Sequence, residues 1–232
     1  MDKKYFTKEY GIDSTHILLK TDTRVNLEEF ILKQRSVIQD EIYKNPLFNG
    51  YESVPINSTS RILELMTRAS NITGIGPMSA VAGSISQVCL EYIEQFGTTY
   101  TILENGGDIA LKTNKTVTLG VYAGDSTFTN SIGLKVKAKK DGYGICTSSG
   151  TVGPSKSFGQ TDATIVFSPQ ASVSDSLATL IGNYGNGKTD EDIVNNALEK
   201  AEDYNEFFDG AIVIKGEYLA KVGKIPKIVT VE

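Results

Sequence analysis

The chain has 232 residues, of which 40% are hydrophobic and 22% charged, as in a globular protein long enough to bury a substantial core. Its net charge of −5 and lack of a basic stripe argue against a nucleic-acid-binding surface. There is no apolar run long enough to span a bilayer, and the N-terminus MDKKYFTKEYGID has no apolar signal core. We therefore expect a cytoplasmic protein with neither nucleic-acid nor membrane partners.

The few cysteines and the single histidine limit the catalytic chemistry. Cys89 and Cys146 form neither a disulfide framework nor a metal-ligand pattern. Cys89 falls on an apolar helical face and is predicted to lie in the core. Cys146 would need a nearby base to act as a nucleophile, and His16 lies far away in a strand-like segment, where a structural role is expected. A Ser-His-Asp or Cys-His enzyme is therefore disfavoured.

The first part of the chain alternates strand and helix patterns. Residues 14–20 alternate as a strand, and Asn26 with Glu29 predicts a capped helix start. A second helix is predicted over 60–70, and a third from Ser79 to about residue 96. The third opens with the small residues SAVAGSIS, whose first-turn N–H groups would favour an anion such as phosphate. Close packing against a sheet explains the same small residues equally well.

The rest of the chain indicates the fold class. Residues 98–138 are predicted to form an antiparallel meander, and a Gly/Ser/Thr-rich loop follows between the strands GIC and ATIVFS. The remaining predicted elements are helices over 172–183 and 189–204 and strands over 210–216 and 227–232. A meander with helices before and after it predicts an α+β fold with antiparallel or mixed sheets, in one domain spanning 1–232. Its exposed edges are compatible with a homodimer.

The stretch ENGGD, residues 104–108, lies between two strand-like runs. Asn-Gly is the strongest short-range signal for a tight hairpin. Glycine also lets the backbone approach a bound group closely, so the rim of a ligand site is the alternative. By themselves these residues favour the hairpin.

The stretch SDSLATLIGN carries a carboxylate and a hydroxyl at helical spacing. Asp175 and Thr179 are four residues apart, so on a helix they share a face, away from Leu177, Leu180 and Ile181. Carboxylate and hydroxyl oxygens suit Mg²⁺. An Asp at a helix start that interacts with the helix dipole is the ordinary explanation.

Four motifs in order, SAVAGS, ENGGD, CTSSG and SDSLATLI, resemble the ApbE family of Mg²⁺-dependent FAD:protein FMN transferases. The corresponding family segments read S-A-I-A-K-G, N-x-GGD, S-T-S-G and A-D-A-L-A-T-A-L. The fuller pattern, which includes GPMSAVAGSISQ and GICTSSGTVGPSKSFGQTDA, is closer still to a small uncharacterised archaeal and bacterial branch of that superfamily. The resemblance covers about residues 10–220 and implies an ApbE-like architecture.

The resemblance also implies a site. Asp175, Thr179 and the main-chain carbonyl of Ala82 would hold Mg²⁺, which would neutralise the pyrophosphate of FAD and the charge on the leaving AMP. Asp108 and Asp175 would be the catalytic carboxylates, with Asp108 orienting the ligand or its water. ENGGD would then be a ligand rim. The residues expected to contact the flavin nucleotide are Ser79, Ser84, Asn105, Gly106, Gly107, Asp108, Thr147, Ser148, Ser149 and Gly150.

The chain departs from the family pattern in two places. The family's H-x-x-D-P-x-T-G-like stretch is replaced by GPSKSFGQTDA, where Lys156 is a candidate for the lost positive charge, and the Lys of A-K-G is replaced by Gly83-Ser84. One hypothesis is therefore Mg²⁺-dependent FMN transfer to an acceptor protein, or hydrolysis of the FAD pyrophosphate. The alternative is a non-catalytic binding protein for a flavin or nucleotide-like small molecule. A different small-molecule enzyme on this scaffold is a third reading.

Overall fold

The computed structural model describes residues 5–152 and 157–231, so Lys156 lies outside the described residues. Within them, one antiparallel sheet has eight strands in the order β1-β2-β3-β4-β7-β8-β9-β10, and a smaller sheet has the order β11-β6-β5. The bounds are β1 Phe6–Ile12, β2 Thr15–Thr21, β3 Thr101–Asn105, β4 Asp108–Thr113, β5 Val117–Gly120, β6 Ile132–Val136, β7 Lys139–Ser148, β8 Ala163–Ser168, β9 Gly210–Lys215, β10 Tyr218–Gly223 and β11 Lys227–Thr230.

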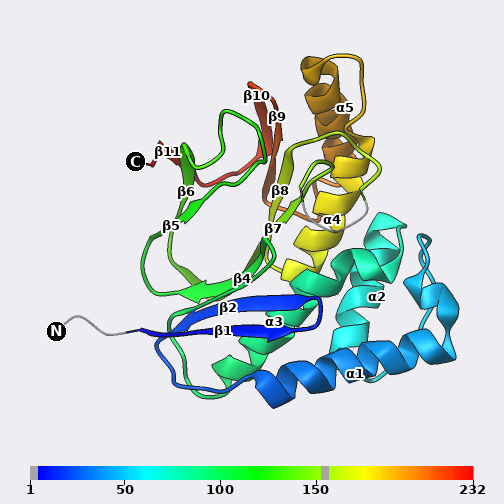
Figure 1. Ribbon diagram of the computed structural model, residues 1–232, viewed down its shortest axis with the longest axis vertical. Helices are drawn as coiled ribbons and strands as arrows, with labels where there is room; N and C mark the ends of the chain where they lie inside the picture. The colour runs from blue at the N-terminus through cyan, green and yellow to red at the C-terminus, as the bar shows by residue number, and fades with distance from the viewer. Residues whose placement is uncertain (1–4, 153–156, 232) are drawn as a thin grey trace.

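The helices lie on one face of the large sheet and the small sheet lies on the other (Figure 1). The helices are α1 Glu28–Lys44, α2 Arg61–Thr73, α3 Val81–Glu94, α4 Ala171–Tyr184 and α5 Asp190–Glu202, with short 3₁₀ turns at Pro46–Asn49 and Pro77–Ala80. None of the described helices is long and apolar enough to cross a bilayer. The observed class is α+β, as the sequence predicts.

Burial along each strand follows from which layers cover it. In β2 every second residue is buried, so that Ile17 and Leu19 pack with α1 and α3 residues while their neighbours face outward. In β8 all six residues are buried, because the helices cover one face of this central strand and the small sheet covers the other. A separate apolar cluster, which includes Leu111, Ile145 and Leu134, fills part of the space between the two sheets.

One sequence prediction about the elements is wrong, and two strands were missed. The stretch 98–138 is not one meander, because β4 pairs with β7 while β5 and β6 pair with each other in the small sheet. The alternation of apolar and polar residues in these segments predicts that they are strands, but it does not specify which strands pair with each other. Strands β1 and β10 were not predicted.

The predicted cap of the first helix is present only as a long hydrogen bond. The N-cap residue of α1 is Leu27, and no side chain caps it. Leu27 is fully buried and its N–H donates to Tyr10 Oη at 3.0 Å. Asn26 Oδ1, one residue earlier, accepts from Lys8 Nζ at 2.7 Å and from the backbone N–H of Glu28 at 3.5 Å. The buried contact of Leu27 with Tyr10 thus accompanies a weak local cap.

The first turn of α4 lies unusually close to both β7 and α3. A Cβ added at Gly144 of β7 would lie 2.4 Å from Ala171 Cα, and one at Gly83 of α3 would lie 2.4 Å from Ala171 O. Real Cβ atoms do not approach backbone this closely, so any larger residue would push α4 away. These two glycines therefore set the distance between α4 and its neighbours.

The Gly144 contact gives a test of this packing. Gly144→Ala should lower the free energy of unfolding by about 1–3 kcal/mol, because the atoms in the way are backbone and cannot rotate aside. Gly120→Ala on β5 is the matched control, since an added Cβ there meets nothing within 4 Å. Urea unfolding followed by circular dichroism measures both variants. Equal stability of the two variants would contradict the close packing.

Candidate functional site

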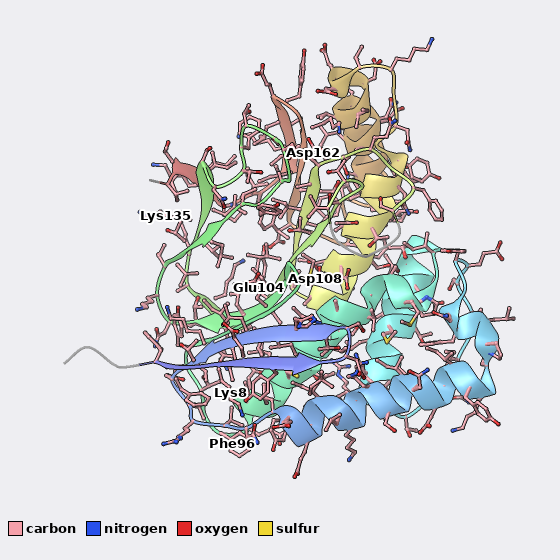
Figure 2. The ribbon with its side chains drawn as sticks, viewed as in Figure 1. Lys8, Phe96, Glu104, Asp108, Lys135 and Asp162 are labelled. Carbon is pink, nitrogen blue, oxygen red and sulfur yellow. The ribbon has the colours of Figure 1, made fainter. Side chains whose placement is uncertain are left out.

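A cavity of about 540 Å³ lies between the two sheets. Its apolar wall includes Ile109 and Ile145 from the large sheet and Leu119 from the small one. Its polar end lies beside the β3–β4 turn, at the centre of the molecule, where Glu104 and Asp108 are labelled in Figure 2. The cavity thus offers an apolar slot between sheets that leads to a cluster of oxygen atoms.

The stretch ENGGD is both a hairpin and part of this cavity. Asn105 pairs with Asp108 across a two-residue turn, and Gly106 and Gly107 have φ values of +63° and +103°. Positive φ at both central positions is what a type I′ turn requires. Gly106, Gly107 and Asp108 also line the cavity. The two readings of this stretch are therefore compatible.

The loop after β7 supplies hydroxyl groups to the same cavity. Thr147, Ser148 and Ser149 line it, and Ser149 Oγ accepts from the backbone N–H of Val152 at 2.9 Å, which holds the loop in a local turn. Gly150 does not line it. An added Cβ at Gly150 would lie 2.1 Å from Gly159 O, so this glycine allows two loop segments to pack closely.

Two buried carboxyl groups, Asp108 and Asp175, form the polar end of the cavity together with the half-buried Thr179. Each aspartate is only 8% exposed. Asp175 Oδ2 accepts from the backbone N–H of Gly83 at 2.8 Å. The carboxyl group of α4 thus caps the first turn of α3. Asp108 Oδ1 is buried and has no hydrogen-bond partner among the described residues.

The two carboxyl groups perturb each other. Burial raises the pKa of Asp175 to about 7, against the opposing effect of the hydrogen bonds from Gly83 and Ala82. Burial, and then the neighbouring Asp175, raise the pKa of Asp108 well above its ordinary value. Burial, and then the same two aspartates, raise the pKa of the Cys146 thiol. Negative charge at this end of the cavity is therefore costly unless a cation compensates it.

Ala82 and Asn105 lie behind the carboxyl pair. Asn105 Nδ2 donates to Ala82 O at 3.3 Å, while Asn105 Oδ1 accepts from the backbone N–H of His16 at 3.2 Å. Asp175 contacts the N–H edge of the Ala82–Gly83 peptide, and in a trans peptide the carbonyl points the opposite way. The structure therefore brings Asp175 to the predicted main-chain segment, with the carbonyl of Ala82 on its far side.

Ser79 and Ser84 do not line the cavity. Ser79 Oγ donates to Gly76 O at 2.7 Å and lies 2.8 Å from Ser176 Oγ, so it connects the 3₁₀ turn to α4. Ser84 is fully buried inside α3. The small residues at the start of this helix thus serve close packing in the structure. Phosphate contact by these two serines stays a prediction.

Sequence reasoning missed the second wall of the cavity, which β5 and the residues after it provide. Leu119, Val121 and Tyr122 line the cavity from this side. Nothing in their local sequence distinguishes them from ordinary strand residues. Glu104 is a third carboxylate on the lining. The interpretation of ENGGD as a ligand rim includes it, although it was not among the residues expected to contact the flavin.

The donors at the polar end fit a divalent cation such as Mg²⁺. An unpartnered carboxyl oxygen of Asp108, the Asp175 carboxyl group and the Thr179 hydroxyl are the hard oxygen ligands that this ion prefers. Within 5–152 and 157–231, no three His, Cys, Asp or Glu side chains are grouped as a metal site. A cation here would therefore also use hydroxyl, carbonyl, water or ligand oxygens.

The chain belongs to the family described as AbpE bacteria, which matches residues 11–223. It is similar to a UPF0280 protein of Methanosphaera stadtmanae, with 53% identity over 97% of this chain and 92% of the relative. A UPF0280 protein of Methanococcus aeolicus is 44% identical over 96% of this chain and 92% of the relative.

Solved structures of flavin transferases share the fold. The flavin transferase ApbE from Vibrio cholerae superposes with a TM-score of 0.56 at 10% identity, covering 94% of this chain and 96% of that one. The Pseudomonas stutzeri flavinyl transferase ApbE superposes with a TM-score of 0.54 at 10% identity, covering 94% of both chains. The predicted membership of an uncharacterised branch of the ApbE superfamily is confirmed, and so is the fold class.

The raised pKa of Asp175 predicts how stability depends on pH. A carboxyl group whose pKa is about 7 when folded and about 3.9 when unfolded stabilises the fold at low pH, and that contribution is lost as the pH rises through 7. In EDTA, the Tm should therefore fall by several degrees between about pH 5 and pH 8. Asp175→Asn should remove much of this fall, because the amide stays neutral and its oxygen can still accept from Gly83. Differential scanning calorimetry measures both.

The exposed Asp125 gives the control for this experiment. Asp125→Asn makes the same chemical change away from the carboxyl pair and should keep the wild-type fall in Tm. If Asp175→Asn and Asp125→Asn show the same pH dependence, Asp175 is already ionised in the folded protein and the assignment is wrong.

Proposed function

We propose that this protein binds a flavin nucleotide such as FAD together with Mg²⁺ in the cavity between its sheets, and that it acts on the diphosphate. The reaction would be FMN transfer to an acceptor protein or hydrolysis of the FAD pyrophosphate. The fold shared with flavin transferases and the four sequence motifs support the ligand class. The cavity geometry supports the orientation, because a flat apolar ring suits the slot and a diphosphate suits the oxygen-rich end.

The charge of the cavity carries the proposal. Its titratable lining includes Glu104, Asp108 and Asp175, and none of the described lining residues is Lys, Arg or His. A diphosphate would be repelled by these carboxylates in a site of low dielectric constant. With the aspartates ionised, a nucleotide would occupy this cavity with a cation between its phosphates and the carboxylates. The proposal therefore requires that nucleotide binding depends on a divalent metal.

Each residue of the polar end has a distinct part in the proposal. Asp175 and Thr179 would hold the metal. The Ala82 carbonyl, which the family resemblance implies as a further ligand, points away from Asp175 and accepts from Asn105 instead. Asp108, with its unpartnered oxygen, would orient the diphosphate or an attacking water. The Thr147–Ser149 hydroxyls would donate to phosphate oxygens. When bound, the metal would supply charge neutralisation at the phosphates and at the leaving AMP.

A binding protein without catalysis is the second candidate. The chain lacks the family's H-x-x-D-P-x-T-G-like stretch and the Lys of A-K-G, so groups that would complete a transfer reaction are not evident. The polar end nevertheless keeps two carboxyl groups and a hydroxyl in one place. These observations favour metal-dependent binding over transfer to a protein, and hydrolysis needs only a positioned water in addition.

The test is FAD binding and AMP release, each with Mg²⁺ and with EDTA. FAD fluorescence should be quenched in Mg²⁺ and unaffected in EDTA, and AMP should accumulate only with Mg²⁺. Asp175→Asn should slow AMP release by about 100-fold or more, because a charged oxygen at the metal is replaced by a neutral one. Asp125→Asn is the matched control and should behave as the wild type.

The possible outcomes separate the candidates. Quenching without AMP would identify a binding protein. Equal quenching in Mg²⁺ and EDTA would contradict the metal-dependent geometry, and no quenching in either would show that flavin is the wrong ligand.

A further inference from the structure

A second cavity, of about 330 Å³, lies on the other side of the β3–β4 turn. Gly106 and Asp108 line both cavities, so the turn separates them. The second cavity also contains Asn105 and Ala82, which lie behind the carboxyl pair. A ligand in it would therefore lie next to the polar end of the first cavity without entering it.

The second cavity has the opposite electrostatic character. Arg35 of α1 and His16 of β2 line it, and Asp108 at its inner end is the one acidic side chain among its described lining residues. The Arg35 side chain is 23% exposed, which places its guanidinium near the opening, and His16 is exposed. Asp108 is buried. The guanidinium is thus at the outer end and the carboxyl group at the inner end.

The guanidinium of Arg35 is held in place and still has donors to offer. It donates to Thr15 Oγ1 and, at 3.0 Å, to Asp13 Oδ2. The Asp13 side chain is 80% exposed, and an ion pair so open to water contributes little free energy. A guanidinium has more N–H groups than these two bonds use. A carboxylate could accept from the remaining donors in a bidentate manner.

The space between the two ends is apolar. Ile38 and Ile42 of α1 form one side, and Met78, Val81 and Ile85 form the other. Ile38 and Ile85 are buried, and the other three are partly buried. Such a surface suits a short hydrocarbon chain and excludes a second charge. The volume is at the small end of the range for small-molecule sites.

We propose that this second cavity is a binding site for a small carboxylate with an apolar chain, whose carboxylate pairs with Arg35 near the opening and whose chain lies along the isoleucines. The far end of the chain lies at Asn105 and Ala82, beside the polar end of the first cavity. The assignment of a binding site needs only the second cavity. A role for this ligand as a second substrate would rest on the proposed flavin chemistry.

The test uses hexanoate as the probe and NMR of the full chain with labelled Ile and Met methyl groups. The titration is done in EDTA and without FAD, so it does not depend on the flavin proposal. Hexanoate should shift the methyl resonances of Ile38, Ile42, Ile85 and Met78. Hexylammonium, which has the same chain length and the opposite charge, should leave them unchanged.

Variants of α1 test the carboxylate contact. Arg35→Gln should weaken hexanoate binding about tenfold or more, because the charge-assisted bonds are lost. Arg35→Lys should retain part of the affinity. Lys33→Gln is the matched control, since Lys33 is exposed on the same helix and does not line the cavity. It should bind as the wild type.

Three results would overturn the assignment. They are shifts of the same methyl groups by hexylammonium, shifts confined to Ile109 and Ile145 of the first cavity, and no shift at all in the wild-type protein. None of these results bears on metal-dependent FAD binding. Conversely, a failure of FAD binding would leave a positive hexanoate titration standing as evidence for the second site.

Discussion

The close approach of the first turn of α4 to α3 and β7 is the constraint on which the site depends. Gly83 and Gly144 remove the side chains that would hold α4 away, and Ala171 fills the space between them. Only at this distance can the Asp175 carboxyl group accept from the backbone of α3. The same approach places Asp175 beside Asp108 on the large sheet. Two elements that are far apart in sequence therefore create one polar end, and backbone contact fixes its dimensions.

This packing explains why the polar end is electrostatically unusual. A carboxyl group that caps a helix start is normally stabilised in its charged form. Here burial outweighs the cap, and the second aspartate makes ionisation of both still less favourable. The unpartnered oxygen of Asp108 has the same origin, because the surrounding backbone leaves it without a donor. Such an arrangement lowers the free energy of unfolding of the protein without a bound ligand, as functional sites often do.

The sequence predicted the local features of the fold and the site well. The β3–β4 turn follows from Gly106 and Gly107, because a type I′ turn needs residues that accept positive φ, and the shared face of Asp175 and Thr179 follows from helical spacing. The pairing of β4 with β7 could not be predicted, since strand alternation carries no information about the partner. For the same reason, the sequence could not predict that Leu119 forms a second wall, or that a cavity lies between two sheets. At the start of α1 the predicted cap at Asn26 is a long bond of 3.5 Å from the Glu28 N–H, and the contact of Leu27 with Tyr10, which local sequence does not predict, accompanies it.

The departure of this chain from the family pattern at Gly83 has a structural reading. The resemblance places a lysine of the transferases at this position, yet any side chain here would meet Ala171 O and Asp175 Cβ at less than 3 Å. In this chain the position has no side chain, which lets α4 approach, and its backbone N–H donates to Asp175. No described residue that lines the first cavity is Lys, Arg or His, while Arg35 lies on the other side of the turn. The β3–β4 turn thus lies between a cavity lined by three carboxyl groups and a cavity with the Arg35 guanidinium at its opening. In our proposals the first needs a metal ion to accept an anion and the second does not.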